Sequence, residues 1–84
     1  MVRRRKIKYS LVLYNDSVNS FEEIIYLIQN IAGYDLTRAA NIAHMAHRAG
    51  KYKFMSFDSK ISAHVTQVMF TKNGVKTEIE VSYE

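Results

Sequence analysis

Two short polar side chains, those of Asn15 and Asp16, come directly after an apolar stretch and could bind a small cation. Residues 10–14 are strand-like, with β-branched and aromatic content, so we expect a strand that these two turn-forming residues end. Four residues further along, an amphipathic helix is expected to begin. An amide oxygen and a carboxylate are thus placed beside the first apolar residues of a helix. This arrangement suits a site that holds a small cationic group next to an apolar pocket.

Three histidines, His44, His47 and His64, are the other candidates for chemistry. His44 and His47 share a helix face, but there is no cysteine and no acidic residue at a spacing that would complete a zinc site. Asp16 with His47 could form a catalytic dyad, yet no nucleophile is placed with them. A simpler role for His47 is to hydrogen-bond the last carbonyls of its helix. We therefore expect no metal, no cofactor and no enzyme activity.

Apolar spacing and capping residues predict the two helices that follow the first strand. The first covers residues 20–32, where apolar side chains recur at i, i+3, i+4 and i+7. Ser20 and Glu23 fit a capping box at its start. The second covers residues 35–49, is rich in alanine, and ends at Gly50.

The rest of the chain is expected to add two strands and a third helix. Residues 51–57 are typical of a strand, and residues 75–83 alternate between apolar and polar types as a half-exposed strand does. Between them, Asp58 or Ser59 caps a helix with a second apolar stripe at i, i+4, i+7 and i+8, formed by Ile61, Val65, Val68 and Met69. The order β-α-α-β-α-β predicts an α+β fold with an antiparallel or mixed three-stranded sheet packed against helices.

Length and charge indicate one domain with a basic end. Eighty-four residues suffice for one modest core. The net charge is +4, but five of the twelve basic residues lie within residues 3–8, so the remainder is close to neutral. We expect residues 1–8 to form a flexible basic tail and residues 9–84 to form the domain. The absence of cysteine suits the cytoplasm, and no apolar run reaches membrane-spanning length.

Residues 9–83 resemble ClpS, the small adaptor that recognises N-terminal degrons and hands them to a Clp unfoldase-protease. The resemblance rests on Tyr9 to Asp16 with the polar loop and helix behind them, on the segment from His47 to Gly50 and Lys51, and on the last strand. It implies a ClpS-like fold and a monomeric adaptor without enzyme activity. The implied partners are N-degron proteins and a AAA+ unfoldase of the ClpA or ClpC type, in the cytoplasm or, in a eukaryote, the plastid stroma.

The resemblance assigns Asn15, Asp16 and His47 to the substrate α-amino group. A protonated amine has three N–H donors, which an amide oxygen, a carboxylate and a neutral imidazole nitrogen can accept. An α-amino group is mostly protonated at pH 7, whereas an internal peptide bond carries no cation, so such a site selects chain ends. The pocket for the first side chain would be lined by Asn19, Phe21, Ile24, Ala43 and Ala46, with Thr77 or Ile79 from the last strand.

Some positions depart from the family pattern. Ser17 stands where the family often has a second acidic residue, and Phe21 replaces a flexible methionine at the entrance of the pocket. Ala43 and Ala46 are smaller than the usual residues, so we expect a reshaped pocket.

An acidic residue and a lysine on the third helix help to dock the unfoldase in the family. Here these positions fall on Lys60, which reverses the charge, and near His64.

Nucleic-acid binding is the alternative function, through the basic tail or an RRM-like sheet. Residues 51–57 resemble the aromatic RNP1 strand of an RRM, and residues 11–15 loosely resemble RNP2. An RRM, however, needs a strand where the alanine-rich residues 35–49 stand. We therefore expect a ClpS-like adaptor that does not bind nucleic acid.

Overall fold

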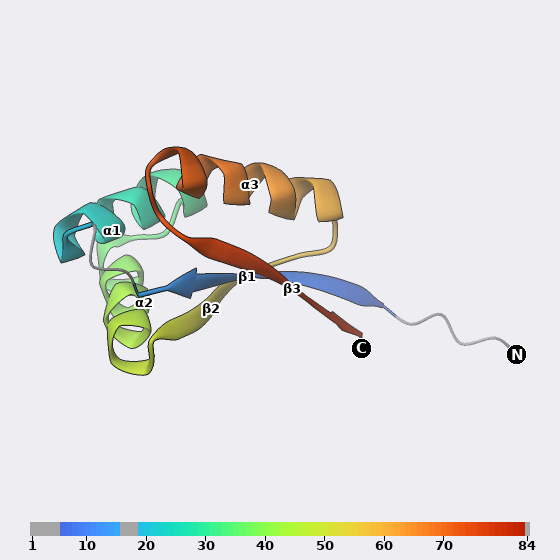
Figure 1. Ribbon diagram of the computed structural model, residues 1–84, viewed down its shortest axis with the longest axis horizontal. Coiled ribbons are helices and arrows are strands. Elements are labelled where there is room, and N and C mark those ends of the chain that lie inside the picture. Colours follow the sequence, from blue (N-terminus) through green and yellow to red (C-terminus); the bar gives the residue numbers. More distant parts are fainter. Residues whose placement is uncertain (1–5, 16–18, 84) are drawn as a thin grey trace, which may run out of the picture.

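The computed structural model describes residues 6–15 and 19–83, and its elements follow the expected order β-α-α-β-α-β (Figure 1). The first helix continues into a π-helical segment, labelled η1 here. The elements are β1 (Ile7–Tyr14), α1 (Phe21–Leu27), η1 (Ile28–Ala32), α2 (Leu36–Ala49), β2 (Lys51–Phe57), α3 (Lys60–Lys72) and β3 (Thr77–Tyr83). The predicted α+β class is confirmed.

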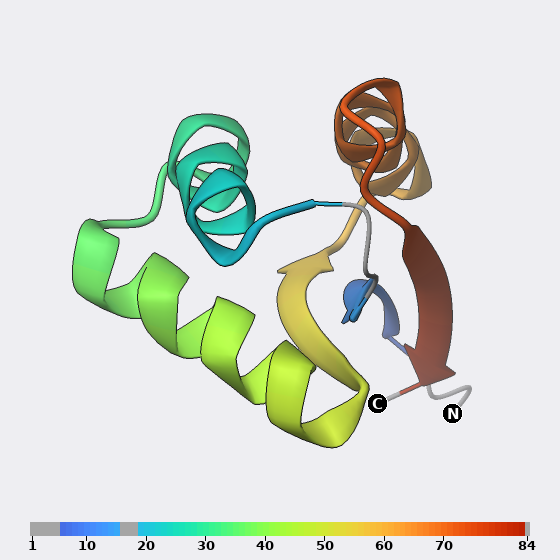
Figure 2. The same ribbon diagram turned by 60° about the vertical axis from the view of Figure 1, so that its left-hand side comes forward.

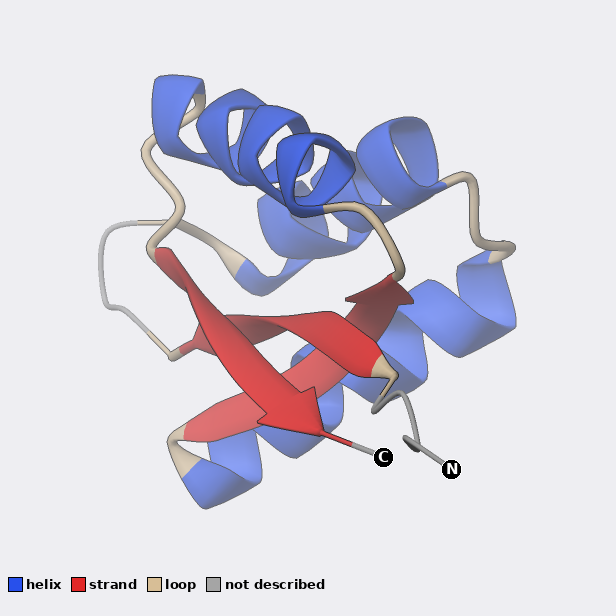
Figure 3. Cartoon of the chain, turned by 90° about the vertical axis from the view of Figure 1, so that its right-hand side faces the viewer, coloured by secondary structure: helices blue, strands red, loops and turns tan. Residues whose placement is uncertain are grey.

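The strands form one antiparallel sheet in the order β2-β1-β3. The first strand of the chain therefore lies between the other two (Figure 2), and both neighbours pair with it along most of its length. Figure 3 shows the strands on one side and the helices behind and above them. Leu11 and Leu13 of β1 are fully buried beneath the helices. Their partners in β3, Ile79 and Thr77, lie on the same face because opposite residues share a face of a sheet.

A bulge in β2 supplies the core with an extra aromatic ring. The pairing shifts between Leu11 and Val12, whose partners are Met55 and Lys53, so Phe54 has no residue opposite it. Phe54 is buried, and its ring meets that of Phe70 edge to face, with centroids 5.4 Å apart. This contact joins the sheet to α3.

Capping residues begin the helices as expected. The Ser20 hydroxyl accepts a hydrogen bond from the Glu23 N–H, and the Glu23 carboxylate accepts one from Ser20, which confirms the capping box. The Asp35 carboxylate caps α2 by accepting a hydrogen bond from the Arg38 N–H at 2.8 Å, and Gly50 ends the helix with a φ of 87° in the left-handed region. The predicted single helix over residues 20–32 is instead α-helical only to Leu27 and then widens into η1.

The apolar stripe expected to bury α3 faces solvent instead. Ile61, Val65, Val68 and Met69 are exposed, whereas Ala63 and Phe70 are buried against the sheet. Ala63 permits a close approach, and Phe70, seven residues later, fills the space beside Phe54. The predicted orientation of this helix was therefore wrong, although its bounds were nearly right.

Two further expectations need correction. Ile7 and Lys8 belong to β1, where they pair with Tyr83 and Ser82, so the strand begins before the expected end of the tail at residue 8. The last strand begins at Thr77 rather than at residue 75. Residues 36–49 are helical, which excludes the strand that an RRM requires. No helix within the described ranges is long and apolar enough to cross a membrane.

Candidate functional site

Asn15 is fixed at the point where the end of β1 meets the end of α2. Its backbone N–H donates to the carbonyl of Gly50 at 2.9 Å, and its side-chain Nδ2 donates to the carbonyl of His47 at 3.5 Å. Two residues that are 32 positions apart in the sequence are thereby neighbours. Both side chains are exposed to solvent. Asp16, the third residue assigned to the amine, lies outside the described residues together with Ser17.

The residue before Asn15 ties this corner to the third strand. The hydroxyl of Tyr14 donates to the Glu78 carboxylate at 2.9 Å, and this hydrogen bond raises the pKa of Tyr14 above its ordinary value. The Lys76 ammonium lies 4.9 Å from the centre of the Tyr14 ring. Since Tyr14 N–H also donates to the Lys76 carbonyl, β3 holds the end of β1 from the side opposite β2.

The residues assigned to the side-chain pocket differ in how deeply they are buried. Ala43, Ala46 and Thr77 are buried, at 5%, 3% and 6% exposure, and Ile24 packs partly buried against the core. Phe21 is 41% exposed. The Asn19 side chain donates to the carbonyl of Gly74 at 2.8 Å, which joins the start of α1 to the loop before β3. The residues of the predicted pocket therefore divide into an exposed member, Phe21, called the rim below, and buried members called the base, Ala43, Ala46 and Thr77.

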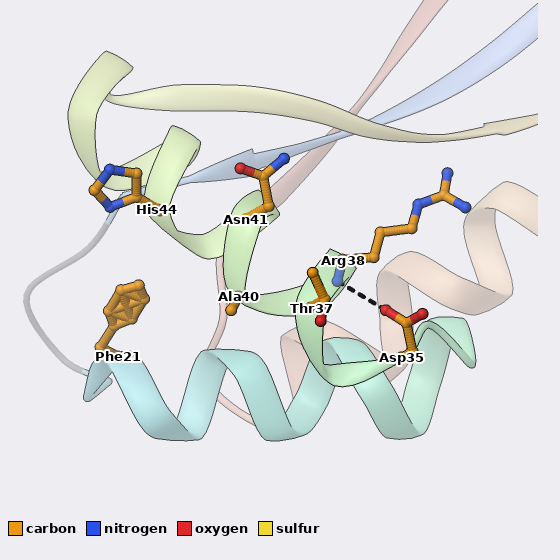
Figure 4. Close-up of a pocket in the computed structure, with 7 residues that line it drawn as sticks. All are labelled: Phe21, Asp35, Thr37, Arg38, Ala40, Asn41 and His44. Carbon is orange, nitrogen blue, oxygen red and sulfur yellow. Dashed lines mark hydrogen bonds between the residues drawn. The ribbon is translucent and has the colours of Figure 1, made fainter.

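Beside the rim lies an open hollow of about 670 Å³ between α1 and the outer side of α2. In Figure 4 the Phe21 ring, from α1, and the His44 ring, from α2, lie one below the other at its left-hand end. This hollow was not predicted from the sequence. The sequence does contain a signal for it, because the polar residues Thr37, Asn41 and His44 recur along one side of α2 at i, i+4 and i+7. The lining residues are Phe21, Asp35, Thr37, Arg38, Ala40, Asn41 and His44.

The buried base contains a polar atom that stands out. The Thr77 hydroxyl is enclosed and has no hydrogen-bond partner in the part of the chain that the structure describes. Its backbone carbonyl, in contrast, accepts a hydrogen bond from the Gln67 Nε2 of α3 at 3.0 Å. The backbone at Thr77 is thus held in place while the hydroxyl is left unpaired.

The residues assigned to partner docking lie on α3, away from Asn15. Lys60 and His64 are exposed near the start of this helix, beside the exposed apolar stripe. The helix contains no acidic residue, and Lys72 adds a third basic group at its other end. Across residues 6–15 and 19–83, no three histidine or acidic side chains gather as a metal site would require.

Together, the three-stranded antiparallel sheet and the helices packed on it define a small α+β domain. A family model described as ATP-dependent Clp protease adaptor protein ClpS matches residues 4–76. Because this match spans most of the chain, the protein belongs to the ClpS family of Clp protease adaptors. Members of this family act as adaptors rather than as enzymes.

A comparison with solved structures agrees with this assignment. The structure of Agrobacterium tumefaciens ClpS2 bound to L-phenylalaninamide superposes with a TM-score of 0.71 and is 16% identical in sequence. The match covers 95% of this chain and 100% of the other. At this identity the similarity establishes the shared fold. No curated protein matches the chain.

Proposed function

We propose that this domain binds the free N-terminus of proteins whose first residue is bulky and hydrophobic, and that it delivers them to a AAA+ Clp unfoldase. The observation that carries the proposal is the hydrogen bond between Asn15 and the carbonyl of His47. It holds the Asn15 side chain against the backbone of His47, whose side chain is also exposed, and Asp16 is the next residue in the sequence. The proposed acceptors are the Asn15 amide oxygen, the Asp16 carboxylate and the His47 imidazole. These are three acceptors for the three N–H groups of a protonated amine.

The ligand of the similar structure supports this chemistry. L-phenylalaninamide, which ClpS2 from Agrobacterium tumefaciens binds, carries a free α-amino group and an aromatic side chain. In the proposed complex the amine contacts Asn15, Asp16 and His47. The first side chain passes Phe21 and rests against Ala43 and Ala46, two buried residues with small side chains.

The expected affinity is moderate. A hydrogen bond to a charged group contributes about 1.5–3 kcal/mol, and burial of a phenylalanine or leucine side chain adds about 1.5–3 kcal/mol. Association and ordering oppose these gains by several kcal/mol. The balance corresponds to a binding free energy of about −8 kcal/mol, which is a dissociation constant of roughly micromolar order. Such an affinity allows an adaptor to release its substrate.

A series of peptides that differ only in the first residue tests this proposal. Peptides that begin with phenylalanine or leucine are expected to bind about 10–100-fold more tightly than one that begins with glycine, because only the former bury a large side chain. Fluorescence anisotropy with a label at the C-terminus measures each affinity. Equal affinity across the series would contradict a pocket for the first side chain.

For delivery, we propose that α3 docks the unfoldase through its exposed apolar stripe. Ile61 is 76% exposed, and the stripe continues along the helix through Val65, Val68 and Met69. A partner that covers it would remove a large apolar surface from water. Since the charged groups of the helix are all basic, the complementary surface is an apolar groove with acidic residues at its edges.

Replacing Ile61 with serine is expected to weaken docking about tenfold or more, because burial of an isoleucine side chain contributes about 1.5–3 kcal/mol. Leu36→Ser is the matched control, since Leu36 is 62% exposed but lies on α2. Surface plasmon resonance with immobilised ClpA- and ClpC-type unfoldases measures both variants. If Ile61→Ser binds as the unmodified protein does, or if Leu36→Ser is equally weakened, α3 is not the docking surface.

A further inference from the structure

The hydroxyl of Thr77 is a buried polar group that makes no hydrogen bond within the described part of the chain. Thr77 is 6% exposed, and its Oγ1 is paired with no atom among residues 6–15 and 19–83. Buried hydroxyls nearly always have a hydrogen-bond partner, because water is lost without replacement when they have none. Valine has the same shape without this cost. The hydroxyl is therefore a candidate for contact with a ligand.

Thr77 lies close to the corner at which the substrate amine is proposed to bind. It pairs with Leu13 across the sheet and shares the helix-covered face with that residue. Asn15 follows Leu13 by two positions, so Thr77 is about 7 Å from it along the strand direction at the usual rise per residue. The Gln67 side chain fixes the Thr77 backbone through a 3.0 Å hydrogen bond to its carbonyl. Only a long side chain of a bound first residue would span this distance.

We propose that Thr77 selects tyrosine over phenylalanine as the first residue of the bound protein, through a hydrogen bond between its hydroxyl and the phenolic hydroxyl. This inference rests on the proposed function. A threonine and a tyrosine hydroxyl can each donate and accept, so one bond forms in either direction. Phenylalanine fills the same volume but leaves the Thr77 hydroxyl unpaired. A site that contains such a buried group discriminates against the analogue that lacks the matching hydroxyl.

The first side chain reaches Thr77 past the rim of the pocket. The Phe21 ring, which is about two-fifths exposed, lies at this rim, and exposed side chains change rotamer rapidly. The base beneath it consists of small residues, because Ala43 and Ala46 present only methyl groups. In the proposed complex, the aromatic ring enters beside these alanines, and its far end contacts the Thr77 hydroxyl of β3.

The experiment compares two peptides that have a free N-terminus and differ only in a first residue of tyrosine or phenylalanine. The unmodified protein is expected to bind the tyrosine peptide about tenfold more tightly, which corresponds to one neutral hydrogen bond. In Thr77→Val this ratio is expected to fall to about one. Thr66→Val is the control, since the Thr66 hydroxyl already donates to the Ser62 carbonyl at 2.9 Å on α3. It should keep the full ratio.

The outcomes separate this inference from the proposed function. If both peptides bind the unmodified protein with equal affinity, or if the preference for tyrosine persists in Thr77→Val, the role of Thr77 is wrong while N-terminal recognition stands. If neither peptide binds, both are wrong. Thermal unfolding gives an independent readout, because removal of an unpaired buried hydroxyl should raise the melting temperature of Thr77→Val. A lower melting temperature would show that the hydroxyl is already paired in the free protein.

Discussion

A peptide with an acetylated N-terminus is expected to bind at least about 100-fold more weakly than the same peptide with a free N-terminus. Acetylation removes the positive charge and leaves one N–H donor where there were three. Loss of two hydrogen bonds to a charged group amounts to about 3–6 kcal/mol, and about 1.4 kcal/mol corresponds to a factor of ten. Isothermal titration calorimetry at pH 7, with a first residue of phenylalanine in both peptides, measures the difference.

A protein variant tests whether this effect arises at the proposed amine site, where the end of β1 meets the end of α2. His47→Ala is expected to weaken binding of the free peptide about tenfold or more and to leave the already weak acetylated peptide little changed, because in the proposed complex His47 contacts the amine only. The side chain is exposed, so its removal should not disturb the core. Arg48→Ala, the next residue along α2, serves as the control. Equal binding of free and acetylated peptides would exclude amine recognition.

Replacing Phe70 with alanine is expected to lower the free energy of unfolding by about 3–5 kcal/mol. The Phe70 side chain is completely buried and packs edge to face against Phe54 of β2. Its carbonyl accepts hydrogen bonds from the N–H groups of Asn73 and Val75, both at 3.0 Å, so the same residue anchors the end of α3. A domain of this size is stable by about 5–15 kcal/mol at most, so the variant would be close to unfolded.

Urea denaturation followed by circular dichroism measures this loss. Met69→Ala is the matched control, since Met69 is adjacent in the sequence but 48% exposed, and its replacement should cost less than about 1 kcal/mol. A larger loss for Met69→Ala than for Phe70→Ala would mean that α3 presents its other face to the sheet, as the apolar periodicity alone suggests.

Local signals made most of the fold predictable. Each strand and helix was expected within a few residues of its position, because caps such as Ser20 and Asp35 act within one turn of their own helix. The family resemblance, carried by short segments near Asn15 and His47, agreed with this order. The contact between those two residues follows from the fold, since β1 ends beside the last turn of α2.

The orientation of α3 was not predictable from the helix itself. Its sequence contains two apolar faces, and the stronger stripe, from Ile61 to Met69, lies outside the core. The choice depends on Phe54, a residue in a distant strand that is turned inward by a bulge and packs with Phe70. Likewise, nothing in the local sequence around Thr77 shows that its hydroxyl is enclosed without a partner. Both features depend on tertiary packing.

The central claim is that a free N-terminus binds where β1 ends against α2. Nuclear magnetic resonance of the isotope-labelled protein, titrated with a free peptide that begins with phenylalanine, tests it most directly. The account predicts that the largest shifts occur at the Asn15 side-chain amide and the His47 ring nitrogens, followed by Phe21 and Ala46. Shifts that leave Asn15 and His47 unchanged and gather elsewhere, for example along α3, would contradict it.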